Sequence, residues 1–286
     1  ANGQRALRRG AGSGAGDVSG FSAEWLALRE PVDAASRNPE LTARLIAWRQ
    51  RFATFSVLDL ASGTGANFRF LAPLLGREQH WRLVDHDPTL LARNGAYWPT
   101  AGTDRGQRQS LCLDLASDWE SLDFQAVQLV TASALLDLVS ADWLERLAQR
   151  CWAAHAAVCI VLSYDGALVW EPALTGDEPV RKWVNRHQRR DKGFGPALGP
   201  WAAPEFKTML ERWGYRVALC PSPWQLDAEQ GALQTALLEG WVDAASEMAP
   251  DSRSGLHDWA LRRRALIEQG VSRLQVGHWD LWAEPS

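Results

Sequence analysis

Residues 56–67 read SVLDLASGTGAN, and this stretch decides how the chain folds. It begins with an apolar run typical of a buried strand and continues into a turn that contains Gly63 and Gly65. Glycine lets the backbone approach a ligand closely and adopt φ values that other residues avoid. A glycine turn between a first strand and a first helix is typical of one wall of a nucleotide crevice in an open α/β sheet.

Segments of strand and helix type alternate on both sides of this turn. The pattern predicts strands at 56–60, 81–84, 109–113, 126–131, 157–163, 215–219 and 272–282. It predicts helices at 21–30, 31–38, 40–52, 67–75, 88–98, 141–155 and 203–213, and two more within 227–270. Short apolar strands that alternate with helices indicate a parallel sheet covered on both faces. We therefore predict an α/β fold, a Rossmann-like three-layer sandwich around a mostly parallel, seven-stranded sheet.

Residues 164–200 interrupt the alternation with a segment rich in glycine, proline and charge. No internal repeat and no second domain boundary appears in the sequence. We predict a single domain over residues 21–286, with a cofactor-binding half at about 50–165 and an acceptor-binding insertion, after strand five, at about 165–202. Residues 1–20 are rich in glycine and alanine, and we expect them to be a flexible tail.

The composition narrows the function classes. The 286 residues carry a net charge of −4. This charge disfavours the class of nucleic-acid-binding proteins that use a broad basic surface. Apolar runs all fall short of the ~18 residues of a membrane span, so we expect no membrane association. The four cysteines form no CxxC pair, which favours reduced thiols in a cytoplasmic protein without a metal site.

Asp85 ends the second predicted strand, twenty residues after Gly65. A carboxylate at that place can accept both ribose hydroxyl protons. The alternative is an NAD(P) site with the pattern G-x-G-x-x-G. Here Phe68 takes the place of the third glycine, and Ala61 replaces an earlier one. A diphosphate therefore fits poorly, and a smaller zwitterionic or cationic ligand fits better.

The order of these motifs resembles that of the class I S-adenosylmethionine-dependent methyltransferases. In that family the first strand ends in an acid and a glycine-rich turn, as in LDLASGTG at 58–65, and the second strand ends in an acid, as in LVDHDP at 83–88. An acid follows the third strand, as in CLDL at 112–115, and the fourth strand gives a segment under the methionine, here VTASALLD at 130–137. The resemblance implies S-adenosylmethionine as cofactor.

The resemblance also implies a role for each matching residue. Asp59 orients the turn or meets the ammonium group through water. Asp85 holds the ribose diol, while Asp114 accepts from the adenine amino group or, alternatively, caps a helix. The remaining positions are Ala61, Gly63 and Gly65 along the methionine and sugar, His86 against adenine or in an exposed loop, Leu115 donating its N–H to the ring, and Ser133 beneath the sulfonium.

The N-terminal segment WLALREP at 25–31 and the later NRHQRRDKGFGPALGP at 185–200 are similar to uncharacterised bacterial members of this family. N-terminal helices often close the cofactor crevice in the family. Arg29 is therefore expected to meet the methionine carboxylate, unless its helix only packs and leaves Arg29 in solvent.

The acceptor is expected at the carboxyl edge of the sheet, where Tyr164 follows strand five. His187 is the candidate general base because imidazole titrates near neutral pH. The insertion offers further substrate-binding groups unless it is a solvated loop; they are Asn185, Arg190, Lys192 and Phe194. Some of the sixteen tryptophans are expected to line an apolar acceptor pocket.

Three functions remain open after this reading of the sequence. The first is methyl transfer from S-adenosylmethionine to a small-molecule O or N acceptor by in-line displacement. An RNA or protein methyltransferase is the second, favoured by RHQRRDK at 186–192 and LRRR at 261–264 and opposed by the acidic balance. The third is a non-catalytic S-adenosylmethionine-binding protein. The sequence leaves the oligomeric state and the acceptor open.

Overall fold

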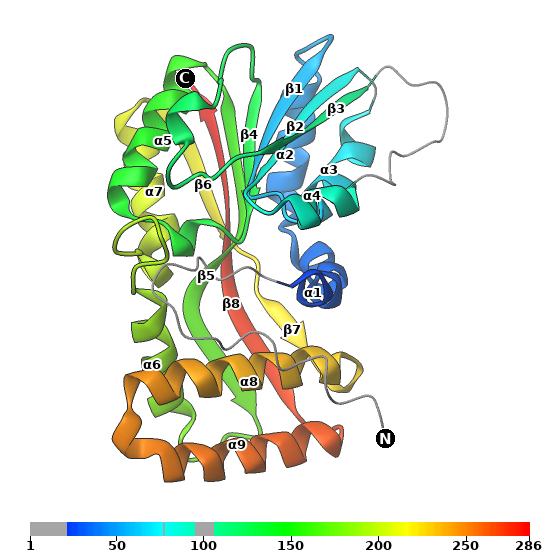
Figure 1. The fold of residues 1–286 in the computed structure, drawn as a ribbon. Coiled ribbons are helices and arrows are strands. Elements are labelled where there is room, and N and C mark those ends of the chain that lie inside the picture. Colours follow the sequence, from blue (N-terminus) through cyan, green and yellow to red (C-terminus); the bar gives the residue numbers. More distant parts are fainter. Residues whose placement is uncertain (1–21, 77, 95–105) are drawn as a thin grey trace.

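The computed structural model describes residues 22–76, 78–94 and 106–286 (Figure 1). Within these ranges eight strands form one sheet in the order β3-β2-β1-β4-β5-β8-β6, with β7 paired to β8. The strands are β1 (Phe55–Leu60), β2 (Gln79–Asp85), β3 (Gln107–Cys112), β4 (Leu129–Ser133), β5 (Ala157–Glu171), β6 (Tyr215–Pro221), β7 (Trp224–Leu226) and β8 (Arg273–Pro285).

The first five strands pair in parallel in the order 3-2-1-4-5, as in a Rossmann-type nucleotide-binding sheet. β8 runs antiparallel to its neighbours β5, β6 and β7. The predicted mostly parallel α/β sheet is therefore confirmed. The predicted count of seven strands missed β7, because a three-residue strand is too short to show an alternation.

Helices cover both faces of the sheet, as predicted. They are α1 (Ala23–Ser36), α2 (Pro39–Arg49), α3 (Ala66–Leu75), α4 (Pro88–Arg93), α5 (Ala141–Ala153), α6 (Asp177–Gln188), α7 (Ala202–Arg212), α8 (Gly231–Met248) and α9 (Arg253–Glu268). Val57 and Leu58 are adjacent on β1 and belong to two different buried clusters, because alternate side chains point to opposite faces. Trp48 and Phe68 pack on one face, and Leu147 and Phe206 pack on the other.

Two helix predictions differ from the structure. Pro31 was expected to open a new helix, but α1 continues through it. A proline inside a helix costs one backbone hydrogen bond, and Trp25 and Val32 on either side of it pack against the core. Helix α6 lies in the segment that the sequence indicated was irregular. Asp87 caps α4 through the Thr89 N–H at 2.7 Å.

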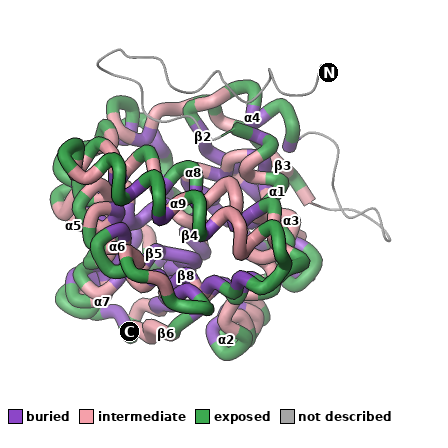
Figure 2. The backbone as a smooth tube through the Cα atoms, turned by 90° about the horizontal axis from the view of Figure 1, so that it is seen from below, coloured by how far each residue is buried: buried purple, intermediate pink, exposed green. Residues whose placement is uncertain are grey.

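β5 and β8 are much longer than the strands beside them. β5 continues to Glu171, although the sequence predicted an end at Ser163. Figure 1 shows both strands passing the carboxyl ends of β1 and β4 into the lower half, where α6, α8 and α9 surround them. Viewed from below, the central strands β4, β5 and β8 are buried, and the helices around them carry many of the exposed residues (Figure 2). The predicted insertion therefore starts as a continuation of the sheet.

Some predictions fall outside the described residues, namely the tail at 1–20 and the end of the helix expected at 88–98. Among the described helices, none has the length and apolar character needed to cross a bilayer. The four cysteines are free, as expected.

Candidate functional site

The turn after β1 is held by backbone hydrogen bonds. Ser62 N–H donates to the Val84 carbonyl at 2.8 Å, and Gly65 N–H donates to the Ser62 carbonyl at 2.8 Å. Gly63 has φ +52° and Gly65 has φ +85°, which are left-handed values. Ala61 adopts φ +51° without being glycine, at a cost of roughly 1–2 kcal/mol.

Asp85 lies directly against this turn. One carboxylate oxygen accepts the Gly63 N–H at 2.8 Å, and the other accepts the Asp87 N–H at 3.0 Å. His86 Nδ1 lies 3.5 Å from the same carboxylate, with the ring half exposed. Asn94 of α4 donates to the Gly63 carbonyl at 3.3 Å. The carboxylate is thus fixed at the carboxyl edge beside the glycine turn.

Asp59 is completely buried beneath the turn. Asn67 Nδ2 donates to its Oδ1 at 2.8 Å, whereas Oδ2 is buried and has no hydrogen-bond partner among the described residues. Burial raises the pKa of Asp59 to about 7, against the opposing effects of the Asn67 hydrogen bond and the Arg37 charge. An unpartnered buried carboxylate oxygen calls for a donor or a cation from a ligand.

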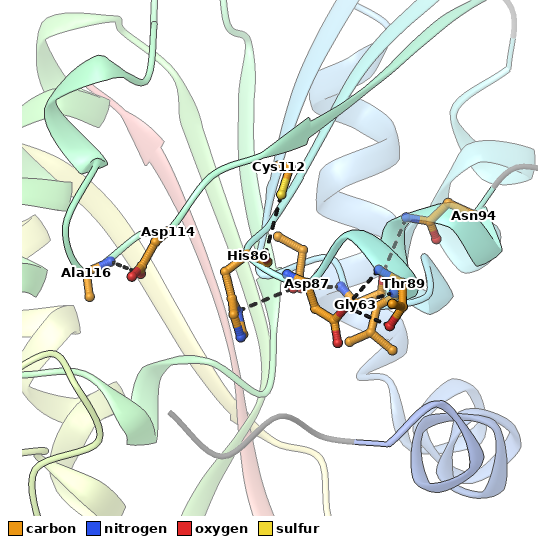
Figure 3. Close-up of polar contacts among 10 residues, drawn as sticks. Gly63, His86, Asp87, Thr89, Asn94, Cys112, Asp114 and Ala116 are labelled. Carbon is orange, nitrogen blue, oxygen red and sulfur yellow. Dashed lines mark hydrogen bonds and ion pairs between the residues drawn. The ribbon is translucent and has the colours of Figure 1, made fainter. Parts of the chain in front are cut away.

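Asp114 and Leu115 follow β3 at the same edge. Asp114 Oδ1 accepts the Ala116 N–H at 2.8 Å within a turn (Figure 3). The next helical segment begins at Trp119 with Asp118 as its N-cap, so the alternative that Asp114 caps a helix is wrong. Leu115 accepts the Trp143 indole N–H on its carbonyl at 2.9 Å. The Leu115 N–H makes no hydrogen bond among the described residues. This N–H is therefore available to a ligand.

These side chains surround one cavity of about 1170 Å³, its open mouth included, which we call the first cavity. Nine of the ten residues predicted to bind the cofactor line it; they are Arg29, Asp59, Ala61, Gly63, Asp85, His86, Asp114, Leu115 and Ser133. Gly65 is the exception. A Cβ at Gly65 would lie 2.2 Å from Asn94 Oδ1, so this glycine makes room for a side chain of the protein.

A second cavity of about 1250 Å³, also open, lies between the sheet edge and the lower helices. It is lined by Tyr164, His187 and Lys192, three of the residues predicted for the acceptor site. The two cavities adjoin, because four residues line both; they are Arg29, Ala134, Leu138 and Lys192. The two cavities therefore meet beside Ala134, directly after the end of β4.

The remaining predicted acceptor residues lie elsewhere. Asn185 accepts the Tyr164 hydroxyl at 2.7 Å and donates to the Gly166 carbonyl at 2.9 Å, so it supports the wall from behind. Arg190 forms an ion pair with Glu247 of α8. Phe194 lines the first cavity and packs edge-on against Trp143. The side chains of the stretch 185–195 thus do not share one site: Asn185 lies in helix α6, Arg190 pairs with Glu247, and Phe194 lines the first cavity.

Burial shifts the pKa values of His187 and Tyr164, two side chains that line the second cavity. It lowers the pKa of His187 below its ordinary 6.5, with the Lys192 charge as the next cause, although Glu247 lies 3.4 Å away. Burial raises the pKa of Tyr164, so its hydroxyl stays protonated and serves as a hydrogen-bond donor. At neutral pH the imidazole of His187 is a free base.

Arg29 is placed at the junction but carries its own partner. It forms two hydrogen bonds with Asp33, at 2.8 and 3.2 Å, and its guanidinium lies 5.0 Å from the centre of the Trp224 ring. The Arg29 side chain is 11% exposed, so the alternative that leaves it in solvent is wrong, while its contact with the methionine carboxylate stays a prediction.

Sequence reasoning gave no role to several residues of the second cavity. Asp137 and His278 line it, and each has a buried polar atom with no partner among the described residues. Trp25, Trp224 and Trp241 form aromatic walls. The excess of tryptophan was the available signal, but it does not say which of them gather. No cluster of metal-ligating side chains occurs within the described ranges.

No protein-family model matches the sequence, and no curated protein matches it. Solved structures do match the fold. The cyclopropane synthase MmaA2 from Mycobacterium tuberculosis is 12% identical with a TM-score of 0.48, covering 92% of this chain and 95% of its own. A SAM-dependent methyltransferase from Thiobacillus denitrificans, in complex with S-adenosyl-L-homocysteine, is 16% identical with a TM-score of 0.43, covering 92% and 98%.

A third similar structure is the phosphoethanolamine N-methyltransferase 2 of Haemonchus contortus, in complex with phosphomonomethylethanolamine and S-adenosylhomocysteine. It is 13% identical with a TM-score of 0.43, and the match covers 93% of this chain and 59% of that one. These likenesses concern the arrangement of helices and strands.

Proposed function

We propose that the protein is a class I S-adenosylmethionine-dependent methyltransferase that acts on a small-molecule O or N acceptor. The observation that carries this proposal is the convergence of Asp59, Asp85 and Asp114 on the first cavity, which adjoins a second cavity where β4 ends. The first three strands each supply one of these acids at or beside the carboxyl edge of the sheet. A nucleoside with a cationic chain matches this distribution of acceptors.

The residues of the first cavity fit the cofactor. The unpartnered Asp59 Oδ2 suits the ammonium group, and Asp85 retains lone pairs for the ribose diol. Asp114 and the free N–H of Leu115 suit the amino group and a ring nitrogen of adenine. Phe68 occupies the third-glycine position of a dinucleotide fingerprint and packs 5.0 Å from the Trp81 ring, which supports the exclusion of NAD(P).

When bound, S-adenosylmethionine supplies an activated methyl group for in-line displacement. The protein has to place the acceptor, exclude water and take away a proton. Ala134 and Leu138 at the junction bring the two ligands together. The His187 imidazole, a free base at neutral pH, receives the proton that the acceptor loses.

The nucleic-acid alternative has little support from the basic stretches. Arg263 in LRRR is buried and paired with Asp177, and Arg190 is paired with Glu247. A nucleic-acid enzyme would instead present such cations to phosphates. We therefore favour a small acceptor over RNA.

Isothermal titration with S-adenosylmethionine and S-adenosylhomocysteine tests the proposal. We expect micromolar binding that Asp114→Asn weakens, since this change keeps the acceptor for Ala116 but removes the charge. Asp118→Asn, an exposed position outside the lining of the first cavity, is the matched control. Folded protein that binds neither compound at millimolar concentration overturns the proposal, while binding without methyl consumption on any extract leaves only the non-catalytic alternative.

A further inference from the structure

One wall of the second cavity is a row of aromatic rings from three strands. Trp224 of β7 lies 4.8 Å from the His278 ring of β8, centre to centre, and His278 lies 6.3 Å from Tyr164 of β5. His278 is buried, and burial lowers its pKa to about 3, so its ring is neutral. The row is therefore an aromatic wall whose neighbouring rings are tilted by 50° and 66°, and the Arg29 guanidinium lies 5.0 Å from the centre of the Trp224 ring.

Helix α8 passes across the same cavity with small side chains. Ala236, Gly240 and Ala244 are spaced four residues apart, so they share one face of the helix, and all three line the cavity. A Cβ built on Gly240 has no atom within 4 Å, so nothing in the described residues fills the space before it. Trp241 and Leu237 beside them extend the apolar surface. The second cavity is thus bounded by the aromatic rings and by the small residues of α8.

A buried carboxylate lies at the inner end of this space. Asp137 is 7% exposed, lines the second cavity, and sits between Ala134 and Leu138, which line both cavities. Its Oδ1 is buried without a partner among the described residues. Arg29 from α1, Lys192 after α6 and the backbone of Tyr164 on β5 face it, and His187 lines the same cavity.

We propose that the second cavity is a slot for a flat, aromatic methyl acceptor, whose O–H or N–H nucleophile is bound by Asp137 where the two cavities meet. This inference rests on the proposed methyltransferase function and specifies the acceptor of that site. Aromatic walls favour a ring by large contact area and stacking. The unpartnered Asp137 Oδ1 accepts the hydrogen of the nucleophile. A lone pair of the nucleophilic oxygen or nitrogen then faces the methyl group.

The reaction balances with the cofactor as the methyl donor. A lone pair of the acceptor oxygen or nitrogen forms the bond to the methyl carbon while the carbon–sulfur bond breaks, and the bonding electrons return to the sulfur. The acceptor's proton passes to Asp137 and leaves by way of His187 to solvent. The products are the methylated acceptor and S-adenosylhomocysteine.

A substitution that fills the slot tests the inference. Gly240→Leu places a side chain before the aromatic row, whereas Gly255→Leu on α9 makes the same change at an exposed helical glycine with equally open surroundings outside the cavity. Binding of naphthol to protein saturated with S-adenosylhomocysteine is measured by calorimetry. We expect Gly240→Leu to weaken naphthol binding at least about tenfold and Gly255→Leu to leave it unchanged.

The role of Asp137 is tested with the same probe. Wild-type protein should bind naphthol at least about tenfold more tightly than naphthol methyl ether, which lacks the O–H, and Asp137→Asn should remove most of this preference. Both variants should retain S-adenosylhomocysteine affinity within about twofold. Equal binding of naphthol and its ether, or naphthol binding unaffected by Gly240→Leu, overturns the inference while the proposed function stands. If the protein binds naphthol but does not bind S-adenosylhomocysteine, the aromatic slot is supported and the proposed methyltransferase function is overturned.

Discussion

The carboxylate of Asp85 accepts the backbone N–H of Gly63 at 2.8 Å, across the 22 residues that separate them in the chain. Together with the Asp87 N–H on its other oxygen, this bond fixes the carboxylate where β1 and β2 end side by side. The same group thereby shapes the turn and faces the first cavity.

Asp85→Ala should abolish cofactor binding, with a loss of at least about hundredfold in affinity, because two charge-assisted hydrogen bonds to the ribose diol disappear. Calorimetric titration with S-adenosylhomocysteine measures this loss. Asp87→Ala is the matched control, since it removes the cap of α4 at a cost of about 1 kcal/mol but leaves the Asp85 carboxylate in place. Similar affinities in the two variants would contradict the assignment of Asp85.

Asp59→Asn should stabilise the free protein at alkaline pH while it removes cofactor binding. The pKa of Asp59 is about 7 in the folded state and 3.8 ordinarily, so between these values the folded state holds the extra proton. Stability therefore falls as the pH rises through this window. An asparagine avoids this loss and still accepts the Asn67 hydrogen bond, so its advantage should grow from pH 5 to pH 8.

Thermal unfolding at several pH values measures that advantage, which we expect to reach about 1–3 kcal/mol at pH 8. Asp243→Asn, at an exposed position of α8, should show no such pH dependence. Cofactor affinity of the wild type should rise over the same pH range, because the ammonium group pairs with the ionised carboxylate. A pH-independent difference between Asp59→Asn and the wild type would refute the burial argument.

His187→Gln should leave cofactor affinity unchanged and reduce turnover by about 10²-fold or more. Burial holds the pKa of His187 below 6.5. The methyl-transfer rate of the wild type should therefore stay constant from neutral pH down to pH 6.5 and fall only in more acidic solution. Methyl-donor consumption at a series of pH values measures both effects. His257→Gln, on the exposed side of α9, is the control, and an identical acid limb in His187→Gln would exclude the imidazole as proton acceptor.

Arg263→Met should destabilise the lower half of the molecule by about 3–5 kcal/mol, because it leaves the Asp177 carboxylate without its cation. The Arg263 side chain is 1% exposed, donates to the Pro172 carbonyl at 2.8 Å and lies 5.4 Å from the centre of the Trp170 ring. Its neighbour Arg264 has a side chain that is 42% exposed and pairs with Glu239 at the surface, so Arg264→Met should cost less than about 1 kcal/mol. Denaturant unfolding of the two variants compares them, and equal losses would contradict the buried-pair argument.

The amino-acid sequence by itself determined the first five strands, the turn at Gly63 and the acids that follow neighbouring strands. These features are local, since each strand shows its own apolar run and parallel strands bring their carboxyl ends to one edge. Eight of the nine predicted residues that line the first cavity lie at or just after these strand ends, whereas Arg29 on α1 was predicted only from the family resemblance. The exception, Gly65, lies against Asn94, the C-cap residue of α4, whose Oδ1 would be 2.2 Å from a Cβ at this position.

Only the tertiary structure decided the second cavity. Trp25, Trp224, Trp241 and His278 come from four separate elements, and their meeting depends on β5 and β8 continuing past the sheet edge as a pair. The burial that raises the pKa of Asp137 to about 6 and lowers that of His187 exists only after this packing. Local patterns carry strand ends and turns, whereas the shape and polarity of a cavity come from contacts between residues far apart in the chain.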